Sequence, residues 1–382
     1  MSTVLLALML LAAGLLAHLL LADARRVPRR ATPVGRATAV SVIIPARNEA
    51  ATLPSLLTSL RSLTAAPREV LVVDDGSDDG TSDIARAQGA TVIRATTPPP
   101  GWTGKAWACH QGVAAASGST LLFLDADTTL EPDALDGLLT LLDQEGGLVS
   151  VQPHHRTVRA YEQLSAYFNV MSLLACGAFA RRRPRHPMAF GPVLVTSRED
   201  YERAGGHSAV RAEILDDARL AAAYDRAGMP VRCLLGGGAV RMRMYPGGTR
   251  QLVEGWTKNI ASGAAAADRW SALAAALWVA SHWAVTVGAV LSVVVVLHGG
   301  PLPLQGPPAL WAAAWVGVTL QLRAMLRRVG SFRWWTWALF PVPLVAFSLL
   351  FARSVLLTSV RREVTWRGRA ITTGRSPRGE VR

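Results

Sequence analysis

The sequence predicts an α/β fold with a mainly parallel sheet, placed between transmembrane helices at both ends of the chain. Residues 37–265 alternate short β-branched runs with stretches of helical periodicity, and long apolar runs lie on either side of this region. Repetition of strand and helix favours parallel pairing through right-handed crossovers. With 382 residues, 50% of them hydrophobic, the chain can form one large core and several membrane segments.

Four buried strands and one amphipathic helix are predicted in the first part of this region. Aliphatic and β-branched runs mark strands at 39–45, 70–73, 91–93 and 120–124. After the first strand, leucines recur at three- and four-residue spacing and give a helix one apolar face. Asn48 is predicted to cap this helix. The leucines are Leu53, Leu56, Leu57, Leu60 and Leu63.

The charge of the chain restricts its partners. Basic residues outnumber acidic ones by 40 to 27, which gives a net charge of +13 and suits nucleic acid, anionic lipid or phosphate-bearing substrates. No basic patch interleaved with aromatic residues occurs outside the membrane flanks, so nucleic acid is not an expected partner. Only Lys105 and Lys258 are lysines, which draws attention to both positions. The three cysteines are widely spaced, as expected in a reducing compartment.

Residues 1–24 are expected to form an amino-terminal membrane anchor. The run from Thr3 to Leu21 has no ionisable side chain except His18, and it nearly spans a hydrocarbon layer of about 30 Å. A cleaved signal peptide is the alternative, but no basic residue precedes the run. Arginines follow it instead, which predicts an outward amino terminus and a cytoplasmic domain. They are Arg25, Arg26, Arg29 and Arg30.

Residues 270–358 are expected to return to the membrane. Apolar runs cover 272–297, 309–322 and 334–352, and two prolines interrupt the last of them. The basic tail at 359–382 is expected to stay in the cytoplasm. Three crossings after a cytoplasmic domain would instead place this tail outside. One run is therefore expected to be re-entrant or interfacial, and the proline-interrupted run is the favoured candidate. The number of crossings stays open.

Acidic motifs follow two of the predicted strands. Asp74 and Asp75 end the second strand, and Asp125 and Asp127 end the fourth. The carboxyl ends of parallel strands line one crevice, where ligands collect. Two carboxylates separated by one residue suit a hard cation such as Mg²⁺ or Mn²⁺. The alternative for each aspartate is an ordinary turn or cap.

Taken in order, these motifs resemble those of the family 2 glycosyltransferases, which have a nucleotide-sugar-binding fold called GT-A. The resemblance covers nearly the whole chain. Residues 45–49, Pro-Ala-Arg-Asn-Glu, resemble the nucleotide loop of the first strand, and 74–77 resemble the nucleotide-contacting turn. The resemblance implies a divalent metal, Mg²⁺ or Mn²⁺, at Asp125 and Asp127. It also implies donor contacts by Pro45, Arg47, Glu49, Asp74, Asp75 and Asp125.

The catalytic base is also assigned by this resemblance. Segment 212–220 occupies the place where the family carries a Glu-Asp pair at a helix start, and here the pair reads Asp216-Asp217. Asp217 is the expected base, and Asp216 departs from the family at the supporting position. Base-assisted single displacement implies inversion at the anomeric carbon. Without the upstream motifs, acids at a helix start would simply complement its dipole.

Other segments resemble membrane-bound members that glycosylate carotenoids or are associated with hopanoid synthesis. Lys105 precedes a predicted helix and is the expected diphosphate contact. The Gln-x-x-Arg-Trp motif of processive synthases is missing, because no arginine lies between Gln251 and Trp256. A single-sugar product is therefore expected. The remaining matching segments are 205–207, 243–247 and 254–259.

Two further binding roles are expected. Trp256 either stacks on a sugar or acceptor or packs at the bilayer interface. Segment 364–369 resembles a carboxyl-terminal element of membrane glycosyltransferases that act at the cytoplasmic face. Its Arg367 and Arg369 are expected to reach the donor or lipid phosphate, or to contact anionic lipid as part of a basic tail.

The resemblance thus implies a multi-pass enzyme of the cell membrane with a cytoplasmic catalytic domain at 37–265. It would transfer one sugar from a nucleotide-sugar to a membrane lipid such as a carotenoid or another isoprenoid. A polyprenyl-phosphate or glycosylceramide-type sugar transferase is the enzymatic alternative. A non-catalytic membrane scaffold is the alternative of a different class.

Overall fold

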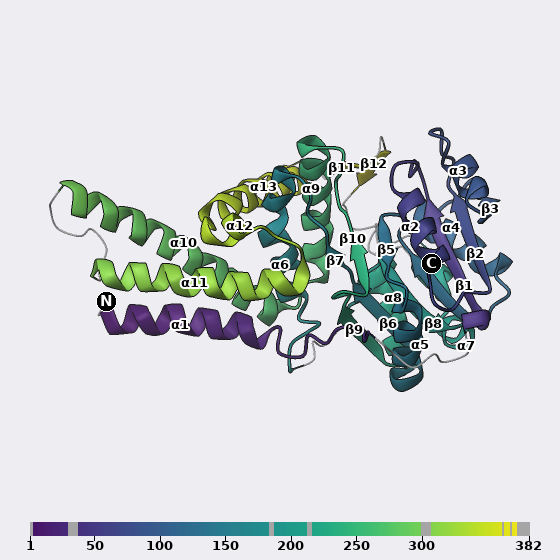
Figure 1. Ribbon diagram of the computed structural model, residues 1–382, viewed down its shortest axis with the longest axis horizontal. Helices are drawn as coiled ribbons and strands as arrows, with labels where there is room; N and C mark the ends of the chain where they lie inside the picture. Colours follow the sequence, from purple (N-terminus) through teal and green to yellow (C-terminus); the bar gives the residue numbers. More distant parts are fainter. Residues whose placement is uncertain are drawn as a thin grey trace, which may run out of the picture.

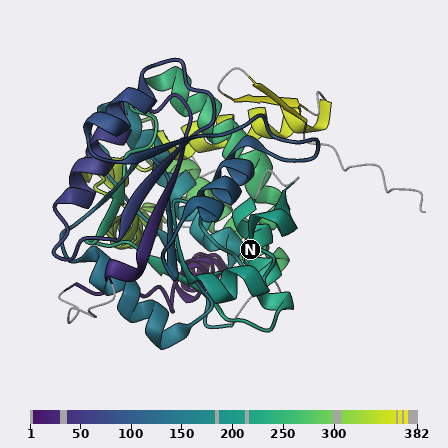
Figure 2. The same cartoon turned by 90° about the vertical axis from the view of Figure 1, so that its right-hand side faces the viewer.

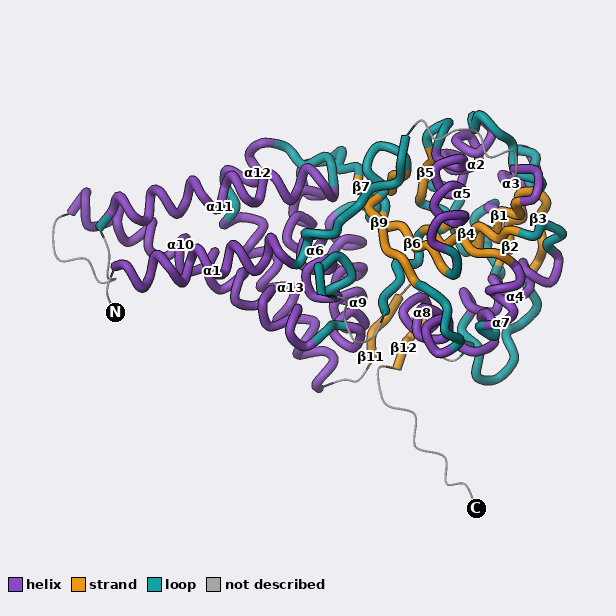
Figure 3. The backbone as a smooth tube through the Cα atoms, turned by 90° about the horizontal axis from the view of Figure 1, so that it is seen from below, coloured by secondary structure: helices purple, strands orange, loops and turns teal. Residues whose placement is uncertain are grey.

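The molecule consists of an α/β domain and a bundle of apolar helices that extends from one side of it (Figure 1). The large sheet is confined to the domain half, and the other half is helical (Figure 3). The computed structural model describes residues 3–29, 37–182, 187–211, 216–298, 307–360, 363–366 and 369–372.

A seven-stranded sheet forms the centre of the domain, in the order β3-β2-β1-β4-β8-β6-β9. All neighbours pair in parallel except β8, which is antiparallel to both β4 and β6. The prediction of a mainly parallel sheet and of its first four strands is confirmed. The strands are β1 (Val40–Ala46), β2 (Glu69–Asp74), β3 (Thr91–Arg94), β4 (Thr120–Leu124), β6 (Leu148–Gln152), β8 (Val193–Ser197) and β9 (Val231–Leu235).

Helices cover both faces of this sheet (Figure 2). One apolar core lies under α2, α3 and α5, and a second core lies under α4, α7 and α8. The predicted leucine face of α2 is buried, as its periodicity requires. The helices are α2 (Leu53–Arg61), α3 (Thr81–Ala87), α4 (Gly104–Ala115), α5 (Ala134–Glu145), α7 (Arg198–Arg203) and α8 (Asp216–Arg226).

The strand order opens a crevice between β1 and β4. The chain runs β1-β2-β3 toward one edge and then returns to place β4 on the other side of β1. Such a reversal is where ligands bind in open α/β sheets. Pairing of β1 with β4 stops at Ile43, whereas pairing with β2 continues to Ala46. Pro45, which has no N–H, therefore lies beyond the last β4 pair and costs the sheet no ladder bond there.

The predicted cap of α2 is wrong. The helix begins at Leu53, and Thr52 occupies the cap position without a side-chain hydrogen bond. Asn48 has a positive φ of 54° and lies in the preceding loop. Its side chain accepts a hydrogen bond from the Asp78 amide at 3.0 Å, and its own amide donates to the Ser77 hydroxyl at 3.0 Å. Asn48 therefore joins the loops after β1 and β2.

Among the described residues, two helices are long and apolar enough to cross a membrane, α10 (Arg269–His298) and α11 (Pro308–Val329). The shorter α1 (Thr3–Leu19) packs beside both, and the three extend together from the domain (Figure 1). The third run thus continues beyond Leu322 to Val329. These helices favour association with a membrane.

The proline-interrupted run folds as two helices, α12 (Trp334–Ala338) and α13 (Pro341–Val360). Proline at the start of α13 is favourable because a first-turn N–H has no helical partner to lose. In Figures 1 and 3, α13 lies between the bundle and the domain. It packs on α6 (Ala166–Cys176) and α9 (Thr249–Ala266).

One glutamine joins the three bundle helices. The Gln321 side chain of α11 donates to the carbonyl of Gly14 in α1 at 2.7 Å. Its carbonyl oxygen accepts from the indole of Trp278 in α10 at 2.9 Å. Polar side chains inside apolar bundles hold helices together because no water replaces a lost partner. Gln321 therefore fixes the relative positions of α1, α10 and α11.

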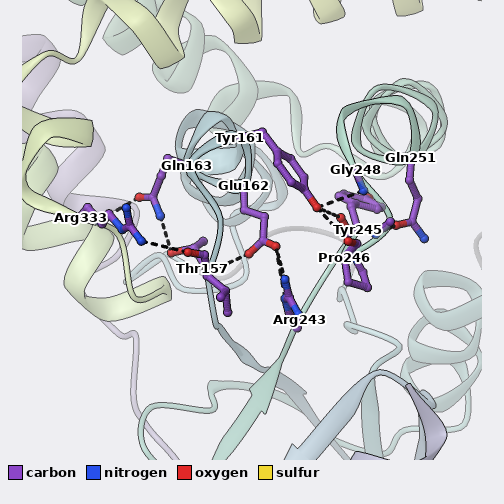
Figure 4. A network of polar contacts seen from close by, with 12 residues as sticks. Thr157, Tyr161, Glu162, Gln163, Arg243, Tyr245, Pro246, Gly248, Gln251 and Arg333 are labelled. Carbon is purple, nitrogen blue, oxygen red and sulfur yellow. Dashed lines mark hydrogen bonds and ion pairs between the residues drawn. The ribbon is translucent and has the colours of Figure 1, made fainter. Parts of the chain in front are cut away.

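A polar network holds the loop after β10 (Val240–Met242) against the domain (Figure 4). Arg243 donates to the carboxylate of the buried Glu162 at 2.7 Å, and the Arg243 amide donates to the Asp127 carbonyl at 3.3 Å. The Tyr161 hydroxyl donates to the Tyr245 carbonyl at 2.9 Å. Although burial opposes ionisation, hydrogen bonds from Arg243 and the Val158 amide hold the pKa of Glu162 below its ordinary value.

We expect Glu162→Gln to lower the free energy of unfolding by about 1–3 kcal/mol at neutral pH, because it weakens a buried charged hydrogen bond. Since the folded-state pKa of Glu162 is lowered, this stabilisation is complete above its ordinary value of 4.5 and is lost as the pH falls. Thermal unfolding of the full chain in detergent at several pH values measures both effects.

Glu254→Gln is the matched control, since Glu254 also pairs with an arginine, at 2.9 Å, but the side chains are 46% and 92% exposed. Exposed pairs contribute little, so this variant should unfold within about 0.5 kcal/mol of the parent. Equal losses in the two variants would contradict a structural role for the Glu162 pair.

Candidate active site

Lys105 and two aspartates meet at the crevice between β1 and β4. The Lys105 ammonium lies 2.9 Å from the Asp125 carboxylate and 4.0 Å from that of Asp217. The three residues come from the first turn of α4, the end of β4 and the first turn of α8. All three side chains are partly exposed, at 38%, 31% and 23%. The site is therefore open to a ligand, and one ammonium group lies between two carboxylates.

The start of α4 places Lys105. Thr103 caps the helix by accepting a hydrogen bond from the Ala106 amide at 3.4 Å. The Thr103 amide donates to the Arg211 carbonyl at 2.8 Å, which ties this start to the segment that leads toward α8. Helix amino termini carry partial positive charge, so Lys105 and the α4 dipole together favour an anion at this end of the crevice.

Asp127 lies deeper, at the turn from β4 to β5 (Thr128–Leu130). Burial and the charges of Asp125 and Glu49 raise the pKa of Asp127, and Lys105 offsets only part of this effect. Glu49 comes from the loop after β1, so three carboxylates from two loops share one region. A cation would relieve their repulsion.

These carboxylates suit a divalent ion that also binds the substrate. Among the residues that the structure describes, no group of three or more His, Cys, Asp or Glu side chains is placed to hold a metal. Mg²⁺ and its relatives commonly use one or two carboxylates and complete their shell with water and substrate phosphates. Asp125 and Asp127 fit this mode, since the negative surroundings that raise the pKa of Asp127 favour a bound cation.

The loops after β1 and β2 form the neighbouring part of the crevice. Arg47 donates to the Asp75 carbonyl at 3.1 Å and lies 3.4 Å from its carboxylate. The Glu49 amide donates to the Thr81 hydroxyl at 2.9 Å. The structure therefore places Arg47 and Glu49 beside the loop of Asp75, and the Glu49 carboxylate is close enough to Asp127 to raise its pKa.

Asp74 differs from the predicted donor contact. Its side chain is buried and accepts hydrogen bonds from the Ser77 amide at 2.8 Å and from the Ser82 hydroxyl. Although burial raises it, these bonds lower the pKa of Asp74 overall. Both carboxylate oxygens are thus used within the turn, and Asp75 is left as the aspartate beside the crevice.

Gly191 makes room for Asp217. A β-carbon at position 191 would lie 2.0 Å from a carboxylate oxygen of Asp217. The adjacent Pro192 carbonyl accepts a hydrogen bond from the Asp125 amide at 2.9 Å. The segment before β8 thus contacts both aspartates. The sequence analysis missed Gly191, for which the only local signal is a Gly-Pro step before a strand.

Tyr245 lies in segment 243–247, which resembles the lipid-modifying members of the family but carried no predicted role for this residue. Its φ is 55°, rare for a side chain of this size, and its hydroxyl accepts from Asn259 at 2.8 Å. Burial, with a contribution from Asp127, raises its pKa. The network around Glu162 holds this strained residue behind the metal motif. Its only local signal is the Tyr-Pro-Gly-Gly run.

Trp256 does not stack on a substrate. The side chain is buried, with the ring parallel to that of Phe168 at 4.7 Å and its N–H donating to Ser165 at 2.9 Å. From the sequence alone, a Trp on the buried face of a helix cannot be distinguished from a Trp that contacts a ligand. Trp256 therefore joins α9 to α6 within the core.

Three predicted residues lie wholly or partly outside the described part of the chain. Arg367 lies outside the described residues. Asp216 begins α8, and Arg369 begins β12 (Arg369–Thr372), which pairs with β11 (Glu363–Trp366). The positions of the last two side chains are not described.

The strand order of this mainly parallel sheet reverses at a crevice, where a lysine and several carboxylates lie together. This is the architecture of a GT-A glycosyltransferase. Residues 41–216 match the family described as Glycosyl transferase family 2. The chain belongs to this family and is a glycosyltransferase. The resemblance stated from the motifs is thereby confirmed.

Curated relatives extend the likeness over most of the chain. The chain is 36% identical over 339 residues to the 4,4'-diaponeurosporenoate glycosyltransferase of Staphylococcus aureus strain USA300, covering 87% of this chain and 88% of the relative. The same enzyme from strain MRSA252 is 35% identical over the same length. The likeness thus includes helical segments outside residues 41–216.

Two solved structures are similar in fold. A mannosyltransferase of Pyrobaculum calidifontis, in complex with GDP-mannose and Mn²⁺, is 21% identical with a TM-score of 0.49, covering 91% of this chain and 98% of that one. Glucosyl-3-phosphoglycerate synthase of Mycobacterium tuberculosis, in complex with Mn²⁺, UDP-glucose and phosphoglyceric acid, is 24% identical with a TM-score of 0.44, covering 64% and 88%. These likenesses concern the fold alone.

We expect Gly191→Ala to lower turnover at least about 100-fold, because the new methyl group displaces the Asp217 carboxylate, and small misplacements cost this much. Nucleotide-sugar binding should be retained. Gly263→Ala is the control, since a β-carbon there has no neighbour within 4 Å. Steady-state kinetics and donor titration separate the two effects, and normal turnover in Gly191→Ala would contradict the placement of Asp217.

Proposed function

We propose that this glycosyltransferase transfers one sugar, with inversion, from a nucleotide-sugar to a membrane lipid. The observation that carries the proposal is the position of Lys105 between Asp125 and Asp217, where a diphosphate and an attacking acceptor would meet. The name of the 36% identical relative supports a carotenoid or another isoprenoid as the acceptor. Identity over 87% of the chain makes a shared acceptor class the simplest interpretation.

The donor would lie along the crevice from the β2 turn to α4. Pro45, Arg47, Glu49 and Asp75 would surround the nucleoside, since their loops are joined by hydrogen bonds at the carboxyl ends of β1 and β2. Lys105 and the start of α4 would bind the diphosphate. This order places the sugar toward Asp217.

Asp125 and Asp127 would hold a divalent metal ion, Mg²⁺ or Mn²⁺. Such an ion, when bound, neutralises the charge of the departing diphosphate. Lys105 supplies a second positive charge on the same side of the crevice. Together they favour departure of the nucleoside diphosphate with the electron pair of the broken bond.

Asp217 would act as the base. Its carboxylate takes the proton from the acceptor hydroxyl while that oxygen attacks the anomeric carbon and the bond to the diphosphate breaks. Attack opposite the leaving group inverts the anomeric configuration. The ammonium of Lys105, 4.0 Å away, attracts the Asp217 carboxylate. Asp216, at the start of the same helix, is assigned a supporting role.

The catalytic domain would lie on the cytoplasmic side of the cell membrane, with a multi-pass bundle formed by α1, α10 and α11. With the amino terminus outside, α1 enters the cytoplasm, α10 leaves it, and α11 returns. Because α13 lies between the bundle and the domain, the carboxyl-terminal region stays on the domain side, in agreement with the arginines there. The basic tail would then contact anionic lipid of the inner leaflet.

We expect Asp217→Asn to reduce transfer by about 10²–10⁴-fold and to leave donor binding unchanged, because the amide cannot take the acceptor proton. Membranes containing the full chain would be incubated with radiolabelled UDP- and GDP-sugars, and the lipids analysed for label. Asp225→Asn, in the last turn of the same helix, is the control. Retained transfer in Asp217→Asn would remove it from the base role. If the label appears in a polyprenyl phosphate or a ceramide, that lipid is the acceptor and the proposed acceptor is wrong.

We expect donor binding to require a divalent ion through Asp127. Chelation should weaken nucleotide-sugar binding by at least about tenfold, and Mn²⁺ should restore it, because the ion joins the carboxylates to the phosphates. Asp127→Asn should bind donor weakly with or without Mn²⁺, whereas Asp83→Asn, at an 88% exposed side chain, should respond as the parent does. Metal-independent binding in the parent would exclude this site.

A further inference from the structure

An arginine-lined pocket lies where the helical bundle joins the domain. It has a volume of about 400 Å³ and is lined by Arg26, Arg156, Arg241 and Arg327, with His154 among them. The four arginines come from the segment after α1, the segment after β7 (His154–His155), strand β10 and the last turn of α11. None of them belongs to the crevice around Lys105. Four distant parts of the chain thus contribute positive charge to one cavity.

Most of this charge has no internal partner. Arg241 lies 3.1 Å from the Glu131 carboxylate, but within the described part of the chain Arg26, Arg156 and Arg327 have no carboxylate at ion-pair distance. Close by, Arg25 and Arg232 share the carboxylate of Glu145 at 2.9 Å and 2.5 Å. Three arginines around one cavity without an acidic partner repel one another unless an anion binds.

The interior of the pocket is polar and positively charged. Burial, followed by the charges of Arg241 and Arg26, lowers the pKa of His154. Its Nδ1 atom is buried and has no hydrogen-bond partner among the described residues, whereas Nε2 lies 3.2 Å from the Ser331 hydroxyl. Gly237 has a φ of 55°, and a β-carbon there would lie 3.1 Å from the Arg26 side chain. The backbone is therefore shaped to let Arg26 lie across it.

A second, smaller pocket lies on the other side of Arg327, which lines both pockets. It has a volume of about 180 Å³, and aromatic rings lie beside arginines in its lining. The lining residues are Arg323, Leu326, Arg327, Phe332, Trp334 and Trp337. The Arg323 guanidinium lies 5.4 Å from the centre of the Trp337 ring. The shared site thus has a cationic part and an aromatic part, as an amphipathic anion requires.

The position of the site corresponds to the headgroup layer of the proposed bilayer. Arg327 is in the last turn of α11, and the neighbouring Arg328 donates to the Leu21 carbonyl after α1 at 3.4 Å, so the ends of both helices meet here. Trp270 at the start of α10 and Trp334 at the start of α12 are 72% and 67% exposed. Exposed tryptophans at helix ends are typical of membrane interfaces.

From these observations we infer that the two pockets beside Arg327 bind one anionic phospholipid of the inner leaflet, with its phosphate among Arg26, Arg156 and Arg327 and an acyl chain along Trp334. The inference rests on the proposed membrane placement. The bound lipid would connect α1, α11 and β10, and β10 leads into Arg243 and the loop beside Asp127. It would thereby set the position of the crevice relative to the bilayer.

The test is a titration of the purified full chain, in neutral detergent, with phosphatidylglycerol, and bound lipid is counted by native mass spectrometry. We expect Arg156→Gln/Arg327→Gln to bind phosphatidylglycerol at least about tenfold more weakly than the parent, since each arginine contributes to anionic-lipid affinity. Arg86→Gln/Arg203→Gln, at exposed arginines on the domain, is the matched control and should bind as the parent does.

Two further arms identify the ligand class. Phosphatidylcholine of the same chain length should bind weakly, and Trp334→Ala should weaken binding of long-chain phosphatidylglycerol more than of the dihexanoyl lipid. Competition by inorganic phosphate as strong as by the lipid, with no effect of Trp334→Ala, would assign the site to a free anion and overturn the inference. Unchanged phosphatidylglycerol binding in Arg156→Gln/Arg327→Gln would also overturn it.

Nucleotide-sugar binding, measured in the same detergent, shows whether each variant is folded. The number of bound phospholipids is measured without any sugar transfer. Failure of the proposed transfer mechanism and failure of the proposed lipid site therefore give different results.

Discussion

The architecture of the active site depends on holding several carboxylates close together around one ammonium group. Asp125 and Asp127 follow β4, Glu49 follows β1 and Asp217 lies in the first turn of α8, and repulsion of Asp127 by Asp125 and Glu49 opposes the fold. Lys105 offsets part of this repulsion at 2.9 Å from Asp125. The rest of the domain holds these groups in place through hydrogen bonds and packing, so that a donor phosphate and a cation find a prepared site.

The neighbouring elements supply that rigidity. The β1–β4 reversal sets where the crevice opens, and Gly191 lets Asp217 approach without a clash. Behind the metal motif, the Glu162–Arg243 pair fixes the backbone of the loop that contains the strained Tyr245. The chain thus concentrates conformational strain and like charge at the crevice and compensates for them in the layer around it.

The sequence predicts the sheet and the position of the crevice because these depend on local patterns. Runs of aliphatic residues define the first four strands, and the acidic motifs at their ends make Asp75, Asp125 and Asp127 candidate site residues before any geometry is known. Local patterns do not reveal the partner of a side chain. Asp74 and Asp75 look equivalent in the sequence, yet only the fold shows that Asp74 is occupied by Ser77 and Ser82.

The same reasoning explains the other differences. Asn48 is of a residue type that favours helix caps, but a hydrogen bond from the Asp78 amide to its side chain outweighs that preference. Trp256 has the position of a ligand-stacking residue, but Phe168 covers it. The arginine-lined pocket has no sequence signature, because its residues are separated by up to hundreds of positions and each is an ordinary arginine in a chain rich in them.

The side-chain amide of Gln321 fixes the position of α1 against the other helices of the bundle. Both ends of that amide are occupied, one by the Gly14 backbone and the other by the Trp278 indole. An unrelated apolar helix could take the place of α1 in the bundle only if it offered a free backbone carbonyl where the Gln321 side chain now meets Gly14. The amino-terminal helix is therefore held in one position against α10 and α11 by a specific hydrogen bond, which its apolar composition does not reveal.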